Sequence, residues 1–219
     1  MRKSWTNASV PYSTTTAGAT LNNERLWPSK DNKTCYAFGG TKTAIWNAWL
    51  APPVNMYQFA LSGSNGSWSL FNSGSPGWKG LTRPDQAAGT TLENTGYILG
   101  GVENSHSSQD TMNLGGTTLP LPGIVSYNMT SGQWFNDTAP ANISNDFFES
   151  VTNFGPMGLL IGAGHADYSP TAPTTISNLT IYEPMDKTWH NQSTTGDAPM
   201  IRNWPCTVGL PGDNGTYEM

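Results

Sequence analysis

The chain has 219 residues, of which only 11% are charged, and its formal net charge is −5. A chain with so few basic residues is not expected to bind nucleic acid, because the phosphate backbone requires a basic surface. Short apolar runs separated by Ser, Thr, Asn and Gly, with no helical periodicity over a dozen residues, predict an all-β protein of short strands joined by turns.

Residues 1–9 are expected to form the last strand of a repeat unit, because Trp5 is followed two residues later by an Asn-x-Ser sequon. Three fuller units follow, over residues 17–72, 85–137 and 146–192, and each is predicted to hold four short strands. Residues 205–219 are expected to begin a further unit. The whole chain is therefore predicted to form a single domain of repeated β-units.

The predicted strands keep one order within each unit. The first strands are Ala19–Leu26, Ala87–Leu92 and Phe147–Phe154, and the second strands are Thr34–Gly40, Thr95–Gly101 and Gly158–Gly164. The third strands are Val54–Leu61, Ile124–Tyr127 and Leu179–Tyr182, and the fourth strands contain Trp68, Trp134 and Trp189. The second strands end at glycines, which tolerate positive φ and close neighbours: Gly39 and Gly40, Gly100 and Gly101, and Gly162 and Gly164.

A pattern of Tyr followed by Trp identifies the units as copies of one repeat. Tyr127 and Trp134 are seven residues apart, as are Tyr182 and Trp189, and both tryptophans begin the sequence Trp-x-Asn-x-Ser/Thr. The first unit departs from this spacing. These large side chains are predicted to fill the space between neighbouring sheets.

The extra length of every unit falls between its glycines and its third strand, over residues 41–54, 102–123 and 165–177. Insertions confined to the same connection in each unit lie on one rim of the assembled sheets. Such loops commonly carry binding sites, so this rim is the predicted binding surface.

These features resemble the kelch repeat. The sequence from Leu26-Trp27-Pro28 to Tyr36-Ala37-Phe38-Gly39-Gly40 is similar to the opening of kelch ectodomains on fungal surface proteins, within the galactose oxidase-like superfamily. The sequence from Ile181-Tyr182 to Cys206 is similar to a later blade of the same group. The resemblance implies a kelch-type β-propeller. Because propellers of this family close with about six or seven blades, it also implies a fragment with three whole blades and parts of others at both ends.

The number of Asn-x-Ser/Thr sequons favours an extracellular glycoprotein. Chance placement would give roughly four or five sequons, whereas the chain has nine, at Asn7, Asn32, Asn65, Asn128, Asn136, Asn142, Asn178, Asn191 and Asn214. Three of these follow a repeat Trp by two residues and therefore face the same way on a strand, so they are expected to carry sugar only where the strand leaves the sheet.

No signal peptide or membrane-spanning run is recognisable in this chain. The expected protein is a cell-surface one whose signal peptide, and a membrane span if it has one, lie outside these residues. Cys35 and Cys206 are expected to be either buried free thiols or members of structural disulfides, and they are not expected to pair with each other.

The resemblance also raises copper-radical oxidase chemistry, which requires two His and two Tyr ligands with one Tyr cross-linked to Cys. None of His106, His165 and His190 has a second His at short spacing, and Cys35-Tyr36 lies in a predicted core strand. No catalytic residue, metal or cofactor is therefore predicted in this chain.

Weak candidates for binding residues lie in the long connections. Trp46 and Trp49 would suit a carbohydrate or peptide if they are exposed, or they pack under their own loop. His165 and Asp167 are either two ligands for a metal or two solvated loop residues. Every Lys and Arg lies outside residues 84–186, which hold about ten carboxylates, so a solvated acidic face is favoured over a cation or basic-partner site.

The predicted function is therefore a non-catalytic extracellular module that binds a protein or glycan at the cell surface through its long loops. One alternative is a galactose-oxidase-like copper-radical oxidoreductase whose metal ligands lie in missing blades. Another is a structural cell-wall protein.

Overall fold

The structure is a computed structural model that describes residues 21–42, 54–63, 65–71, 77, 81–121, 123–140, 150–155, 158–163, 175–200 and 206–218. Within these residues the regular structure is β, apart from short 3-10 turns such as η2 (Met112–Leu114) and η3 (Asp213–Gly215). The predicted all-β class is confirmed.

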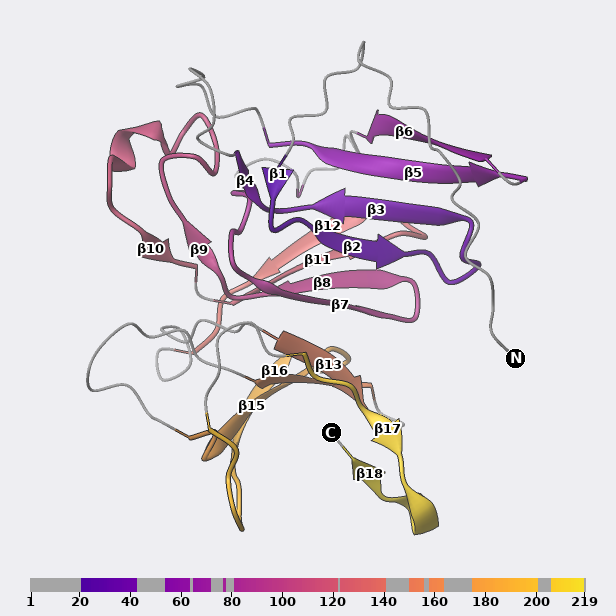
Figure 1. Cartoon of the computed structure of the whole chain (residues 1–219), viewed down its shortest axis with the longest axis vertical. Helices are drawn as coiled ribbons and strands as arrows, with labels where there is room; N and C mark the ends of the chain where they lie inside the picture. Colours follow the sequence, from indigo (N-terminus) through magenta and orange to yellow (C-terminus); the bar gives the residue numbers. More distant parts are fainter. Residues whose placement is uncertain are drawn as a thin grey trace.

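Three four-stranded antiparallel sheets dominate the described residues, and in each sheet the hydrogen-bonded order follows the chain order (Figure 1). The first sheet contains β2 (Arg25–Pro28), β3 (Thr34–Phe38), β5 (Met56–Ser62) and β6 (Asn65–Phe71). The second contains β7 (Ala88–Leu92), β8 (Thr95–Leu99), β11 (Ile124–Asn128) and β12 (Gln133–Asp137). The third contains β13 (Ser150–Phe154), β14 (Leu159–Ala163), β15 (Asn178–Glu183) and β16 (Thr188–Ser193).

Three two-stranded pairs accompany the sheets in the described part of the chain. These are β1 (Leu21–Asn22) with β4 (Thr41–Lys42), β9 (Val102–Glu103) with β10 (Leu119–Pro120), and β17 (Leu210–Pro211) with β18 (Tyr217–Glu218).

The first strand of the first sheet lies later in the chain than predicted. The prediction was Ala19–Leu26, whereas β2 starts at Arg25. Asn23 adopts a positive φ of 63°, which interrupts the extended backbone, so the residues before it pair with β4 instead of joining the sheet. The pattern of apolar residues does not indicate the positive φ of Asn23, so the sequence placed the start of this strand too early.

The aromatic pair of the repeat is a cross-strand pair in every sheet. Tyr127 lies directly opposite Trp134 and Tyr182 opposite Trp189, with ring centroids 4.8 Å apart in both pairs. In the first sheet Phe59 lies opposite Trp68, with a centroid distance of 5.2 Å. The longer sequence spacing in that unit therefore reflects a longer β5–β6 hairpin, and Phe59 occupies the place of the tyrosine.

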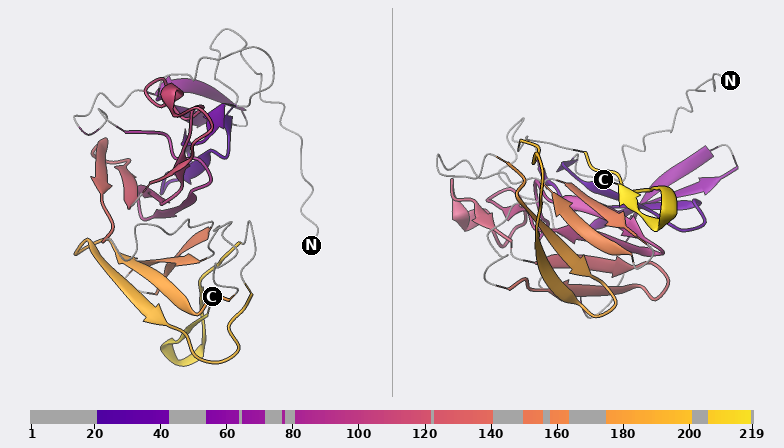
Figure 2. Two further views of the ribbon diagram at one scale, coloured as in Figure 1. Left: turned by 90° about the vertical axis from the view of Figure 1, so that its left-hand side faces the viewer. Right: turned by 90° about the horizontal axis from the view of Figure 1, so that it is seen from below.

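The three sheets are stacked face to face (Figure 2). One buried cluster lies between the first and second sheets and comprises Trp27, Tyr36, Phe38, Met56, Leu81, Ala87, Ile98, Tyr127 and Trp134. A second cluster lies between the second and third sheets and comprises Ala88, Leu99, Ile124, Ala139, Val151, Leu160 and Tyr182. Successive residues of a strand in the second sheet, such as Ile98 and Leu99, therefore fill two different interfaces, as the two-residue period of a strand requires.

Aromatic contacts hold the first and second sheets together. The Trp134 ring lies 4.7 Å from Phe38 and 6.0 Å from Trp27, measured between ring centroids. Burial in this cluster raises the pKa of Tyr127 to about 12, and the neighbouring Tyr36 adds to the rise.

Trp27 lies between the two sheets and packs against Gly96, where any side chain would overlap the indole ring. Its indole N–H donates to the backbone oxygen of Tyr97 at 3.3 Å. A Cβ atom on Gly96 would lie 2.1 Å from Trp27 Cδ2, well inside van der Waals contact. The absence of a side chain at residue 96 is thus a packing requirement.

Polar bonds add to the contact between the second and third sheets. The Tyr182 hydroxyl donates to Asp137 Oδ2 at 3.1 Å, and Lys187 Nζ lies 3.6 Å from the same oxygen. Burial, reinforced by the Asp137 carboxylate, raises the pKa of Tyr182.

The first strands of successive sheets lie side by side, with β7 between β2 and β13. Arg25 Nε donates to the Ala87 carbonyl, across the β2–β7 boundary. Residues 207–209 lie against β13 in turn, because the backbone N–H of Thr207 donates to Ser150 Oγ and that of Gly209 donates to Thr152 Oγ1, both at 3.0 Å.

Paired glycines follow the second strands of the first two sheets with positive φ. The φ angles are 91° and 78° at Gly39 and Gly40, and 61° and 93° at Gly100 and Gly101. In the third sheet Gly162 lies within β14, and Gly164 lies outside the described residues.

The Trp27–Gly96 contact generates a test of the stacking. Gly96→Ala is expected to lower the free energy of unfolding by about 1–3 kcal/mol, because the added methyl overlaps the indole. Urea unfolding followed by tryptophan fluorescence measures the change. Gly116→Ala is the matched control, because a Cβ there meets no atom within 4 Å. Equal effects of the two substitutions would contradict the packing role of residue 96.

Candidate functional site

In all three sheets the second strand ends and the third strand begins at the same end of the strands, called the insertion rim below. The described residues of these connections are 39–42, 54–55, 100–121, 123 and 175–177. The connections at the opposite ends of the strands are short, as at residues 29–33, 93–94 and 129–132, and they form the turn rim. Figure 1 shows β4, β9 and β10 together at one end of the strands.

Asp85 joins the first and second sheets at the insertion rim. It is only 5% exposed. Its Oδ1 accepts hydrogen bonds from Asn23 Nδ2 at 2.8 Å and from the backbone N–H of Gln86 at 2.9 Å, and its Oδ2 accepts from Asn104 Nδ2 at 3.3 Å. Two backbone bonds between Asp85 and Val102 bind the start of the second insertion to the same point. One buried carboxylate thus ties together two sheets and an insertion.

Arg83 lies two residues away and is 1% exposed. Its Nε donates to the Ser107 backbone oxygen at 2.8 Å, which anchors the second insertion. Its positive charge also acts on Glu24 of the first sheet. A buried guanidinium needs such compensation, because burial alone disfavours the charged form.

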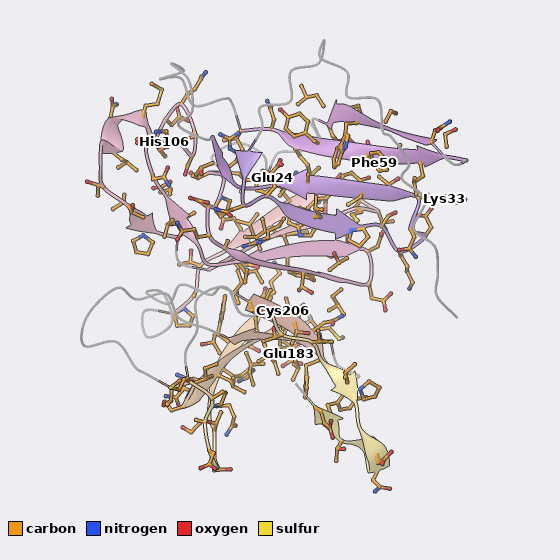
Figure 3. All side chains as sticks on the ribbon, viewed as in Figure 1. Glu24, Lys33, Phe59, His106, Glu183 and Cys206 are labelled. Atoms are coloured by element: carbon orange, nitrogen blue, oxygen red, sulfur yellow. The ribbon has the colours of Figure 1, made fainter. Side chains whose placement is uncertain are left out.

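Glu24 is the most unusual titratable group of this rim. Its side chain is half-buried just before β2, and burial raises its pKa from 4.5 to about 7, while Arg83 opposes the rise. No hydrogen bond to its carboxylate occurs among the described residues. Glu24 therefore changes charge near neutral pH beside a permanently charged arginine. Figure 3 shows Glu24 and His106 on the insertion-rim side of the sheets.

The second insertion is held in place by its own side chains. Ser107, Ser108 and Thr111 are buried. The backbone N–H of Asn104 donates to Ser107 Oγ at 3.0 Å, and Thr111 Oγ1 donates to the Asn104 carbonyl at 2.8 Å. This network supports an outer surface of polar side chains that face solvent: His106, Gln109, Asp110 and Asn113. The insertion can therefore offer hydrogen-bonding groups from a fixed backbone.

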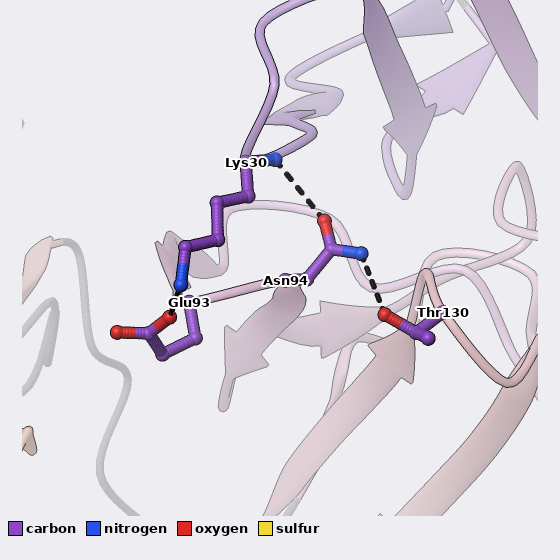
Figure 4. Close-up of polar contacts among 4 residues, drawn as sticks. All are labelled: Lys30, Glu93, Asn94 and Thr130. Atoms are coloured by element: carbon purple, nitrogen blue, oxygen red, sulfur yellow. Dashed lines mark hydrogen bonds and ion pairs between the residues drawn. The ribbon is translucent and has the colours of Figure 1, made fainter.

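The turn rim has polar contacts of a different kind. Lys30 forms an ion pair with Glu93, and its backbone N–H donates to Asn94 Oδ1 at 3.1 Å (Figure 4). Asn94 Nδ2 donates to Thr130 Oγ1 at 2.8 Å. The Lys30 and Glu93 side chains are mostly exposed, so the pair contributes little stability and organises no enclosed site.

All four residues proposed from the sequence as binding candidates lie outside the described part of the chain. These are Trp46, Trp49, His165 and Asp167. His106 is exposed on the second insertion, and His190 lies on β16 with its Nε2 3.7 Å from Glu183 Oε2. Within the described residues, no three or more His, Cys, Asp or Glu side chains gather where they could hold a metal ion.

The acidic interval does not form one solvated face in the described residues. Asp85 is buried at the insertion rim, and Glu93 is exposed on the turn rim. Asp85 precedes β7 and Glu93 follows it, so these two carboxylates lie at opposite ends of one strand. Both cysteines are free thiols, and Cys206 is exposed rather than buried because it lies in an irregular segment.

Six of the sequons are exposed, at Asn32, Asn65, Asn136, Asn178, Asn191 and Asn214, whereas Asn128 is half-buried. Asn7 and Asn142 lie outside the described residues. Asn136 and Asn191 are exposed although they lie within β12 and β16. Both lie on the outermost strands of their sheets.

Glu24, Arg83 and Asp85 were not singled out from the sequence. The one available signal was that Arg83 and Asp85 flank Pro84 directly before a predicted strand, where charged residues are otherwise scarce. The hydrogen bond of Asp85 to Asn23 and the interaction of Arg83 with Glu24 join segments that are far apart in the sequence, which local patterns do not reveal.

No protein-family model matches the chain, and no curated protein matches it. Among solved structures, one titled "Structure of YjhT" is similar, with 14% sequence identity and a TM-score of 0.49. The similarity covers 82% of this chain and 54% of that one, so the chain spans about half the length of that structure. Among the described residues, no helix has the length and hydropathy needed to cross a membrane.

The raised pKa of Glu24 predicts a pH-dependent stability. The unfolded carboxyl loses its proton near pH 4.5 and the folded one near pH 7, so the protonated group favours folding fully below the first value, and this contribution is lost as the pH rises through the second. At about pH 8, the free energy of unfolding of Glu24→Gln should therefore exceed that of the unmodified protein by about 1–2 kcal/mol, after allowing for the partial exposure of Glu24.

Urea unfolding at about pH 4 and about pH 8 measures this effect, and the advantage of Glu24→Gln should disappear at the lower value. Glu93→Gln is the control for removing a carboxylate, because Glu93 is exposed on the turn rim. An advantage of Glu24→Gln that is equal at both pH values would contradict the burial of an ionisable Glu24.

Proposed function

We propose that the chain is part of a kelch-type β-propeller and acts as a non-catalytic binding module outside the cell. The three sheets would be its blades, over residues 17–72, 85–137 and 146–192, and residues 205–219 would begin a further blade. Support for this comes from three antiparallel four-stranded sheets stacked in chain order, with their first strands side by side. Residues 207–209 continue that line of first strands beside β13.

One observation carries the binding role: a buried charged cluster fixes the second insertion, residues 100–121, at the insertion rim. Arg83 and Asp85 have no exposed surface of consequence, so their part is to position the insertion. The solvent-facing side chains His106, Gln109 and Asp110 then present donors and acceptors on a preorganised backbone. Preorganisation lowers the entropy lost on binding.

The ligand class proposed is a protein or a glycan at the cell surface, because the exposed groups of the insertion are neutral or singly charged hydrogen-bonding groups. An extracellular location is supported by the excess of sequons, six of which are exposed. The ligand class and the extracellular location are also what the resemblance to kelch ectodomains of fungal surface proteins implies.

A binding screen with paired variants tests this role. The unmodified chain is applied to arrays of glycans and of surface proteins, and the triple variant His106→Ala/Gln109→Ala/Asp110→Ala is compared with it. The triple variant is expected to lose about tenfold or more in affinity for the bound ligand. Lys30→Ala/Glu93→Ala, on the turn rim, is the matched control and should change affinity less than about twofold.

Equal losses in the two variants would contradict binding at the insertion rim. Failure of the folded chain to bind any arrayed glycan or protein would contradict the binding role itself. Turnover of a sugar or alcohol by the copper-loaded chain would contradict the non-catalytic assignment.

A further inference from the structure

The outermost strands of the three sheets form open edges. They are β6, β12 and β16, and among the described strands each of them is paired on one side only. The first strands of the sheets lie side by side, so these fourth strands lie at the opposite side of the stack. Under the proposed function, further units would add sheets to the stack and would not add strands to these edges. Their exposure is therefore a property of each sheet by itself.

These three strands lack the residues that usually protect an edge. An unpaired edge can pair with another chain, and natural sheets prevent this with Lys, Pro, a bulge or a covering segment. None of the three strands contains Lys or Pro, and each pairs with its third strand without a bulge. Their one acidic residue, Asp137, is engaged by Tyr182 and Lys187. β6 is seven residues long and has no acidic or basic residue.

Each outermost strand instead contains an Asn-x-Ser/Thr sequon. The sequons begin at Asn65 in β6, Asn136 in β12 and Asn191 in β16, and all three Asn side chains are exposed. The three carboxamides form no hydrogen bond with another described residue. Gly77 packs against the backbone of Trp134 near the start of β12, and Asn136 lies beyond that contact.

The sequons of the third strands differ, because the fold uses their carboxamides. Asn128 Oδ1 accepts hydrogen bonds from the backbone N–H groups of Thr130 and Ser131, both at 2.9 Å. Asn178 Oδ1 accepts from Ser193 Oγ at 3.0 Å. The described first and second strands contain no sequon. Within the described strands, an exposed sequon with an unbonded carboxamide therefore occurs on the outermost strand of every sheet and on no other strand.

We propose that Asn65, Asn136 and Asn191 carry N-linked glycans that cover the open edges of the three sheets. The proposal rests on the extracellular location in the proposed function, because the donor of the glycan is a lipid-linked oligosaccharide of the secretory pathway. The carboxamide nitrogen forms a bond to C1 of the first sugar, and the bond between C1 and the lipid pyrophosphate breaks. The pyrophosphate leaves with the electron pair of that bond, and the amide releases one proton.

A glycan in this position hinders the pairing of an edge with another chain. A partner strand must approach to about 4.7–4.9 Å to form the hydrogen bonds of a ladder. A bulky, hydrated sugar attached to the edge strand occupies that space and adds solubility. The glycans thus replace the charges and prolines that the three strands lack.

Mass spectrometry of the protein isolated from the cells that make it measures the occupancy of each sequon. Digestion with peptide N-glycosidase in heavy-oxygen water converts every glycosylated Asn into a labelled Asp. Labels are expected at Asn65, Asn136 and Asn191.

The outcomes separate this inference from the proposed function. Labels at other sequons, with one or more of these three unlabelled, would overturn the inference and leave the extracellular location standing. No label at any sequon would overturn both the inference and that location. The binding role has its own test on the arrays, which does not depend on the sugars.

A second measurement tests what the sugars do. The chain is secreted from a eukaryotic host behind a fused signal peptide, and its monomer is followed by light scattering coupled to size exclusion at about 50 µM protein. Asn136→Gln/Asn191→Gln is expected to lose monomer several-fold faster than the unsubstituted chain. Asn32→Gly/Asn214→Gly is the matched control, because it also removes two exposed sequons but from turns, where glycine suits the positive φ of both residues.

The same variants made without sugars in a bacterial host separate the glycan from the Asn side chain. In that host Asn136→Gln/Asn191→Gln should associate at the rate of the unsubstituted chain, because the edges are bare in both proteins. Faster association of this variant in the bacterial protein would assign the effect to the side chains and overturn the edge-covering role. Equal rates for the two double variants in the secreted protein would overturn it as well.

Discussion

Each of the three four-stranded sheets has apolar side chains on both faces, so each requires a neighbour on both sides. The second sheet shows the constraint most clearly, because Ile98 and Leu99 are consecutive residues that fill two separate clusters. A single four-stranded sheet of this composition could not remain folded in water, since one of its faces would stay exposed. Stacking is therefore the condition for folding, and details such as Trp27 resting on Gly96 are adjustments that let neighbouring sheets approach.

Stacking also decides where function can lie. Once the faces are used for packing, only the two rims, the outermost strands and the ends of the stack remain accessible. The turn rim has short connections and exposed contacts such as the Lys30–Glu93 pair. The insertion rim combines the long second insertion with a buried cluster around Arg83 and Asp85, which joins two sheets and supports an exposed polar surface. At the first sheet, which is one end of the stack, Trp68 and Leu70 remain exposed.

Many strands could be predicted because their apolar and polar residues alternate over short stretches of the sequence. The strands β8 and β11 lie where Thr95–Gly101 and Ile124–Tyr127 placed them. The prediction failed where a single backbone angle intervened, as at Asn23 before β2. The candidate site was missed for a different reason. Its defining contacts, such as Asn23 with Asp85, join residues of different units, and no local pattern indicates that two such residues will meet.

The sequence by itself determined the all-β class, the positions of most strands, the repeating aromatic pair and the single connection that is lengthened in each unit. These are properties of segments of a few to some tens of residues, and periodicity, turn chemistry and residue spacing are sufficient to specify them. Only the tertiary structure decided which aromatic pairs are buried, that Glu24 lies beside Arg83, and that Asp85 is a junction between sheets. These depend on contacts across stacked sheets, where burial and charge are set by a neighbour that the local sequence does not contain.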